Sequence, residues 1–186
     1  MIKTVSLYES SIGQRVLIAI AGICLCAFLI AHLQRTHGMS RTVATAIAMA
    51  TVVGSLLGAV VQARRAPPNP PLVGPAVLVA GAVTSIALAP TALLVLPGAA
   101  VFGFGMIGFW TALQARVLLL RPGQAGTVSA VVSTIELCGF VVPIGIGVVV
   151  DAHGLRAGIA CYAVIALLLL TVVMRAREGT PDVVPS

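Results

Sequence analysis

The side chain best placed to do chemistry in this sequence is Glu136, the only acidic residue inside any apolar segment of the chain. It lies near the middle of residues 126–150, and a helix of that length spans about 37 Å, against about 30 Å for a bilayer's hydrocarbon core. A carboxylate at that depth costs at least ~2.5 kcal/mol, so it normally faces a protein interior or a water-filled cavity. Glu136 is therefore interpreted as a proton-carrying or cation-binding group. The alternative is a structural role, as a protonated carboxyl hydrogen-bonded to a neighbouring helix.

Four further residues complete the predicted proton-coupling or substrate pathway. Ser129 and Ser133 precede Glu136 at steps of four and three, which places the three on one helix face. The serines either line the same cavity as Glu136 or donate to carbonyls of their own helix. Trp110 and Gln114, from the preceding apolar segment, are weaker candidates, because a tryptophan there is equally consistent with packing or an interface anchor.

Small residues predict close helix packing in two places. Gly139, Pro143 and Gly147 follow one another at steps of four and form a notched ridge on residues 126–150. Pro143 predicts a kink there, because it has no N–H and its ring crowds the carbonyl of Gly139. Gly54 and Gly58 form a G-x-x-x-G pair, a spacing that lets two helix backbones approach closely, although chance in a glycine-rich chain is an equal alternative.

The composition indicates an integral membrane protein. Hydrophobic residues make up 59% of the 186 residues and charged residues only 9%, against about 25% charged in soluble domains. The net charge of +6 does not predict nucleic-acid binding, because the basic residues are scattered between apolar segments and aromatic residues are only 4%. The four cysteines all lie in apolar segments, where a free thiol acts as a small hydrophobe.

The apolar segments predict an all-α protein with six membrane spans. Residues 1–15 form a cytoplasmic, interfacial lead-in, residues 16–174 a six-helix transmembrane domain, and residues 175–186 a disordered cytoplasmic tail. Pro90 separates the third span from the fourth, because one continuous run would need extreme tilt to fit a bilayer. The spans cover residues 16–33, 42–62, 72–90, 91–115, 126–150 and 157–174.

Lysine and arginine predict the orientation of this multi-pass protein in the cell membrane. With the N-terminus inside, three basic residues lie outside: Arg35, Arg41 and Arg156. The other eight lie inside: Lys3, Arg15, Arg64, Arg65, Arg116, Arg121, Arg175 and Arg177. Both termini are therefore predicted to be cytoplasmic.

No motif in the sequence indicates an enzyme or a cofactor. Gly103, Gly105 and Gly108 match the dinucleotide pattern G-x-G-x-x-G, but they lie inside an apolar span and not at a strand-to-helix turn, so close packing is the better interpretation. Neither G-x-S-x-G nor H-E-x-x-H is present, and the three histidines lie at or beyond the ends of spans. We expect no metal and no catalytic residue.

Six helices with both ends inside, a loop rich in proline and arginine after the second, and the motifs of residues 120–160 together resemble the C-terminal half of a major facilitator superfamily transporter. The loop Arg121-Pro-Gly-Gln-Ala-Gly is similar to the family's loop into its eleventh helix, and residues 139–147 followed by Asp151-Ala-His-Gly154 are similar to that helix and its D-x-x-G ending. The signature loop after the second helix departs from the family pattern, because Gln62-Ala-Arg-Arg has no acidic residue. The resemblance implies two three-helix repeats, residues 16–90 and 91–174.

The resemblance also implies a function. Family members transport small solutes by alternating access between two six-helix halves, so this chain would need a second half or a second copy of itself. We expect one half of a solute transporter, with the bilayer and a small solute as its other partners. The alternative is a non-transporting membrane module, or a truncated remnant, that packs against a partner membrane protein through its glycine faces.

Overall fold

The computed structural model describes residues 25, 28–65, 71–120, 126, 130 and 141–178, and their regular structure is entirely helical. The all-α prediction is therefore confirmed for these residues. A helix over residues 28–37 comes first. It is followed by α2 (Arg41–Arg65), α3 (Val73–Leu88), α4 (Ala92–Leu120), α6 (Val141–His153) and α7 (Leu155–Glu178).

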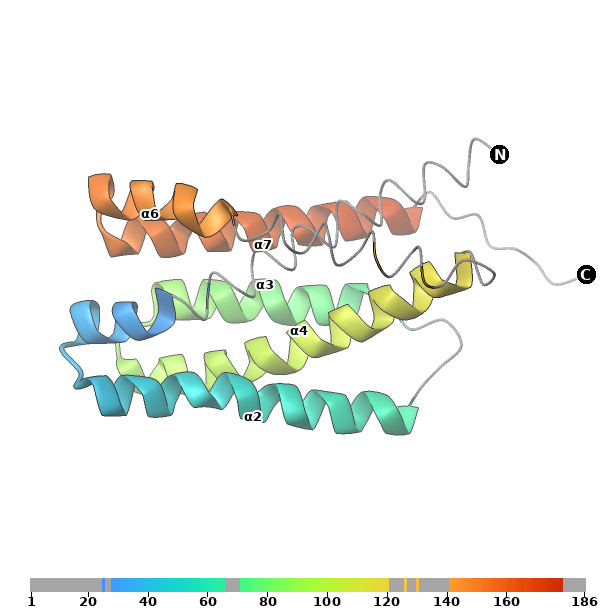
Figure 1. The fold of residues 1–186 in the computed structure, drawn as a ribbon, viewed down its shortest axis with the longest axis horizontal. Helices are drawn as coiled ribbons and strands as arrows, with labels where there is room; N and C mark the ends of the chain where they lie inside the picture. Colours follow the sequence, from blue (N-terminus) through green and yellow to red (C-terminus); the bar gives the residue numbers. More distant parts are fainter. Residues whose placement is uncertain are drawn as a thin grey trace, which may run out of the picture.

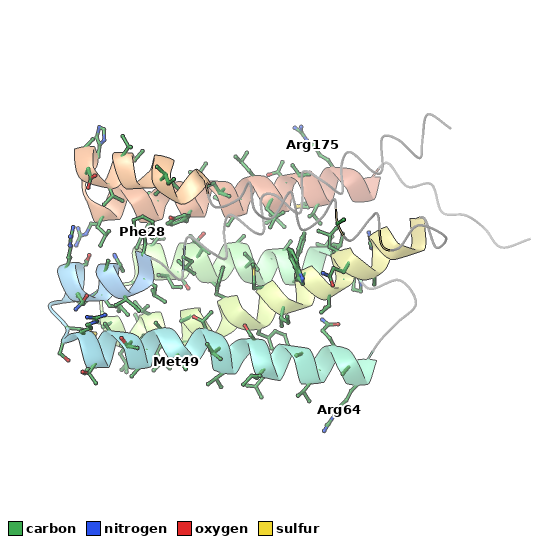
Figure 2. The ribbon with its side chains drawn as sticks, viewed as in Figure 1. Phe28, Met49, Arg64 and Arg175 are labelled. Carbon is green, nitrogen blue, oxygen red and sulfur yellow. The ribbon has the colours of Figure 1, made fainter. Side chains whose placement is uncertain are left out.

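Successive described helices run in opposite directions along one bundle axis (Figure 1). Three short connections, at residues 38–40, 89–91 and 154, make this reversal necessary. Arg64 near the end of α2 and Arg175 near the end of α7 accordingly lie toward the same end of the bundle (Figure 2). The described residues thus alternate in direction as successive membrane spans would.

Glycine and proline set these reversals. Gly38 (φ 64°) and Gly154 (φ 85°) each adopt the left-handed conformation that follows a helix end and that side chains with a Cβ resist. At the third reversal Ala89 is extended (φ −60°, ψ 116°), because the following Pro90 excludes the helical conformation for it. The structure therefore has two separate helices on either side of Pro90, as predicted.

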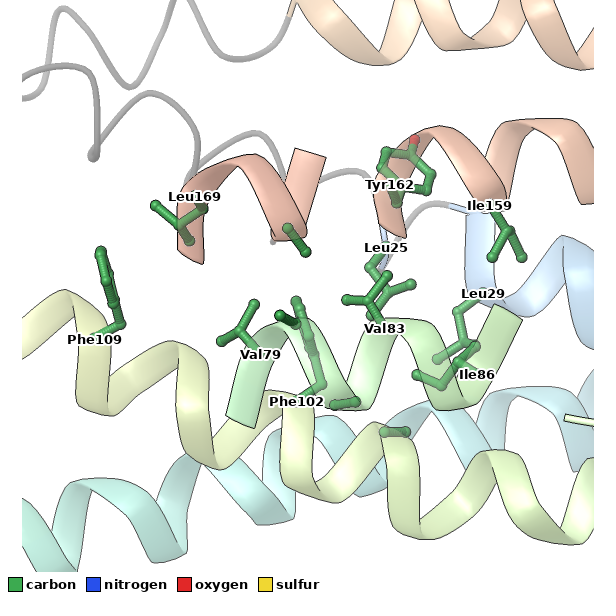
Figure 3. Close-up of a cluster of buried hydrophobic side chains, with 14 of the residues drawn as sticks. Leu25, Leu29, Val79, Val83, Ile86, Phe102, Phe109, Ile159, Tyr162 and Leu169 are labelled. Carbon is green, nitrogen blue, oxygen red and sulfur yellow. The ribbon is translucent and has the colours of Figure 1, made fainter. Parts of the chain in front are cut away.

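The centre of the bundle is α3, which packs against α4 on one side and α7 on the other. Its apolar surface goes all the way round the helix, and Val79, Val83 and Ile86 are fully buried. They meet Phe102 of α4 and Tyr162 of α7 in the cluster drawn in Figure 3. On the periphery, α2 packs against α4 and α6 against α7.

Three helices are long and apolar enough to cross a membrane: Arg41–Arg64, Ala92–Arg116 and Leu155–Arg175. The apolar helices Val73–Leu88 and Ile144–His153 are shorter. The 16 residues of α3 span about 24 Å, less than a typical hydrocarbon core. The fold is thus compatible with a helical membrane protein, while six spans in two repeats stay a prediction.

Five helices end three to five residues beyond the predicted boundaries. Among them, α2 continues to Arg65 and not 62, and α6 continues to His153 and not 150. The first helix continues to residue 37 and not 33, α4 continues to Leu120 and not 115, and α7 continues to Glu178 and not 174. Polarity marked the predicted ends, but arginine and glutamine are good helix formers. Each helix instead continues until a glycine or proline lies close ahead, as Gly38 does for the first.

Candidate functional site

Four residues predicted to form the pathway or its packing ridge lie outside the described residues: Glu136, Ser133, Ser129 and Gly139. Pro143 belongs to α6, but its side chain is not described, so the predicted kink is untested. Gly147 also lies in α6, and a Cβ at that position would meet no described atom within 4 Å. A close helix contact at Gly147 therefore does not occur within the described part of the chain.

The remaining pathway residues lie in the second half of α4. Trp110 is half-buried and packs against the apolar core, whereas Gln114 is exposed. They are four residues apart and share a helix face. Between them, the Thr111 hydroxyl donates to the carbonyl oxygen of Ile107 at 2.9 Å. The structure thus brings Trp110 and Gln114 onto one face, where the indole contributes to packing.

The backbones of α2 and α4 approach each other closely at glycines of both helices. The missing side chain of Gly54 makes room for the backbone of Ala100, and that of Gly103 makes room for the backbone of Thr51. One turn further along, Gly58 faces the backbone of Phe104. We call this contact the glycine seam, because both helices give up a side chain to form it.

A hydrogen bond crosses the same contact. Ser55 Oγ donates to the carbonyl oxygen of Gly103 at 3.2 Å. Ser55 was not among the predicted site residues, although a serine directly after the first glycine of G-x-x-x-G is a usable signal for an interhelical bond. Because α4 fills the face of Gly54 and Gly58, that face is not available to a partner protein. Gly54 and Gly58 therefore serve packing within this chain.

The glycines of the G-x-G-x-x-G pattern serve contacts between helices. While Gly103 faces α2, Gly105 faces Leu78 of α3, with a Cβ there only 2.9 Å from the leucine Cβ. Gly108 lies against Gln62 of α2 and Pro75 of α3. The three positions therefore let α4 approach two neighbours at once, and they lie in the middle of a helix where no phosphate-binding turn exists.

A histidine pair lies at the end of the bundle where the first helix meets α7. His32 is only 3% exposed, and its Nδ1 lies 3.2 Å from the hydroxyl oxygen of Thr36. The ring of His37 stands edge-on to it, with centroids 5.5 Å apart, and its Nε2 is buried with no hydrogen-bond partner among the described residues. Arg156 of α7 adds a positive charge close to His32.

From the sequence, these histidines were expected only to lie at or beyond the ends of spans. A threonine four residues after His32 was the signal for a local hydrogen bond. Two positively charged imidazolium rings beside Arg156 would repel one another. Within the described residues no group of three His, Cys, Asp or Glu side chains could hold a metal ion.

Two apolar grooves open on the bundle surface. The first, which we call the α2 groove, has a volume of about 360 Å³ and lies between the first helix and α2. The second, the α3–α4 groove, has a volume of about 470 Å³ and lies beside the Pro90 reversal. Leu29 and Ile30 line the α2 groove from one side, and the face of α2 that carries Thr45, Ala48 and Ser55 lines it from the other.

The comparisons with known proteins add no relative. No protein-family model matches this chain, and a search of curated proteins finds no match. The resemblance to major facilitator transporters therefore stays a prediction that depends on the quoted sequence motifs.

Proposed function

We propose that this chain is one half of a solute transporter of the major facilitator type, working by alternating access in the cell membrane with both termini in the cytoplasm. The second half is either another copy of this chain or a separate six-helix protein. The cargo is a small solute. The sequence favours a neutral, apolar or weakly cationic one, since its expected pathway has no cluster of charges.

The observation that carries the proposal is the packing of α3 against α7 at the centre of the bundle. In the expected arrangement of two three-helix repeats, α3 closes the first repeat and α7 closes the second. Their contact gives the two repeats a common core, as expected for repeats that fold into one unit. Ile159, Tyr162 and Leu169 of α7 are all buried in this core.

The α2–α4 contact supports the same proposal. Alternating access requires each half to move as a rigid body against the other. Gly54 and Gly103 let a helix of the first repeat approach a helix of the second at backbone distance, and the Ser55 hydrogen bond crosses that contact. Among the described residues three helix contacts join the repeats, α3–α7, α2–α4 and α3–α4, and they would keep this half from separating while it rocks.

Glu136 would couple transport to protons. Its role depends on its position in the sequence, inside the apolar residues 126–150. An acid that is neutral in one state and charged in the other would make the two states differ in stability with pH, which is what coupling requires.

The experiment is proton-coupled flux in liposomes that contain the full chain. A pH gradient is imposed, a panel of neutral and weakly cationic solutes is added, and a trapped pH dye reports solute-dependent proton movement. We expect Glu136→Gln to abolish the coupled flux. Glu178→Gln, which removes an acid at the end of α7, is the matched control and should retain it.

Two outcomes would count against the proposal. Coupled flux that persists in Glu136→Gln would show that Glu136 does not couple transport to protons. No flux for any solute, together with a monomeric mass in the bilayer with and without co-expressed membrane partners, would argue against transport altogether. A chain that gives no flux but forms a stable complex with another membrane protein would instead be the non-transporting module.

A further inference from the structure

The α2 groove follows one face of α2 for about ten residues. Thr45, Ala48, Val52 and Ser55 lie at steps of three and four along this face and line the groove. The ten residue-to-residue steps from Thr45 to Ser55 correspond to a length of about 15 Å along the helix. Half of a hydrocarbon core of about 30 Å is also about 15 Å, so the groove is as long as one leaflet is deep.

The lining of the groove is suited to an acyl chain. Leu29, Ile30, Ala48 and Val52 present only hydrocarbon. The hydroxyl of Thr45 donates to the carbonyl oxygen of Arg41 at 2.8 Å, so it does not require a polar partner in the groove. A ligand with a polar body would leave its own groups without hydrogen bonds along this length.

A basic residue lies at one end of the groove. Arg41 is the first residue of α2, is exposed, and shares the helix face of Thr45 four residues later. Side chains on a helix lean toward its N-terminus, so the guanidinium extends beyond the groove toward the end of the bundle. No acidic residue occurs in the sequence between Glu9 and Glu136, so neither α2 nor the first helix supplies a carboxylate to neutralise it.

The α3–α4 groove provides an internal comparison. It is larger, and its lining includes Ser85, Leu94 and Pro97 but no charged side chain. A lipid tail could lie in either groove. Neither lining contains a charged side chain, but the α2 groove has Arg41 one turn before Thr45 on the same helix, whereas α3 and α4 have no basic residue within one turn of the second groove. Selectivity for a charged headgroup is therefore expected at one groove and not at the other.

We propose that the α2 groove binds one acyl chain of an anionic phospholipid, whose phosphate pairs with Arg41. This site goes beyond the proposed function, since it needs only that α2 cross a membrane. Arginine pairs with phosphate through two parallel hydrogen bonds, and one such charge near a membrane surface corresponds to about a fivefold preference for an anionic lipid.

The test is lipid binding to the full chain in detergent micelles, measured by native mass spectrometry. Phosphatidylglycerol and phosphatidylcholine with identical acyl chains are titrated separately. We expect one tightly held lipid, with phosphatidylglycerol bound about fivefold more tightly. Arg41→Gln should lower phosphatidylglycerol affinity to that of phosphatidylcholine, while Arg64→Gln, which removes a charge at the other end of α2, should leave the preference intact.

A second pair of variants tests whether the acyl chain lies in the α2 groove. Ala48→Leu would fill the groove and should lower the affinity for both lipids by at least fivefold. Ala46→Leu adds the same side chain at an exposed position two residues away, outside the groove lining, and should change neither affinity. Because Arg41 is exposed, the Arg41→Gln measurement still decides the matter if Ala48→Leu does not fold.

Several results would overturn the proposal. Equal binding of the two lipids by the unmodified chain would show that Arg41 does not select the headgroup. Equal losses of phosphatidylglycerol affinity in Arg41→Gln and Arg64→Gln would show the same. Equal effects of Ala48→Leu and Ala46→Leu would show that the acyl chain does not lie in the α2 groove. A change of oligomeric mass in Ala48→Leu with unchanged lipid binding would assign the groove to a second copy of the chain. None of these results depends on transport.

Discussion

The glycine seam predicts that one added methyl group will separate α2 from α4. In Gly54→Ala the new Cβ would coincide with the backbone of Ala100, which cannot rotate away as a side chain could. Overpacking of this kind costs about 1–3 kcal/mol. The same substitution gains up to about 1 kcal/mol of helix propensity, because glycine is the poorer helix former. We expect Gly54→Ala to lower the free energy of unfolding by about 1–2 kcal/mol.

Gly81→Ala is the control for the gain in helix propensity that comes with replacing glycine by alanine. Gly81 is exposed inside α3, and a Cβ there would meet no described atom within 4 Å. The substitution should raise the free energy of unfolding by about 0.5–1 kcal/mol. The difference between the two variants isolates the steric cost at the seam, since both replace a glycine inside a helix.

The assay is reversible unfolding of the full chain by sodium dodecyl sulfate in mixed micelles, followed by far-ultraviolet circular dichroism. A Gly54→Ala variant as stable as Gly81→Ala would refute the close approach of α2 and α4. The double variant Gly54→Ala with Gly103→Ala is a second check. Its loss should be smaller than the sum of the single losses, because helices already moved apart by one methyl group have room for the next.

Three further predictions use the same unfolding assay. Ser55→Ala should cost about 0.6 kcal/mol, the average for an interhelical hydrogen bond in a membrane protein, and no loss would show that the bond to Gly103 contributes nothing. Gly38→Ala should cost about 1–2 kcal/mol, because its φ of 64° is strained for alanine although the space around it is open, and Gly38→Asn should cost less. Phe102→Ala, at a buried position, should lower stability by at least 1 kcal/mol more than Leu88→Ala, where the leucine is 77% exposed; equal losses would contradict the α3–α4 core.

The sequence was sufficient for the helical class and for most helix positions, because hydropathy and proline are local signals. Pro90 marked the reversal between α3 and α4 without any knowledge of their contacts. Helix ends were less predictable. Hydropathy reports where a segment ceases to be apolar, but the helix ends where the backbone must leave helical geometry, as it does at Gly38.

Contacts between helices could be predicted only in part. The spacing of Gly54 and Gly58 indicated a close approach, but spacing on one helix cannot name the helix opposite. The structure shows that helix to be α4, through Gly103, which the sequence had placed in a different motif. The α2 groove was not predicted, because it depends on the space left between two helices, and no single segment encodes that space.

The polar groups of the central helices bear on the role proposed for Glu136. Thr84 and Ser85 of α3 donate to carbonyl oxygens of their own helix at 2.8 Å, and Thr111 of α4 does the same at 2.9 Å. The hydroxyl hydrogens are therefore already bonded within their own helices, and these neutral groups carry no charge that a proton could neutralise. Within the described parts of α3 and α4 no acidic side chain takes their place. If this chain moves protons through its centre by way of a carboxyl group, Glu136 in residues 126–150 is the acid that the sequence offers inside an apolar segment.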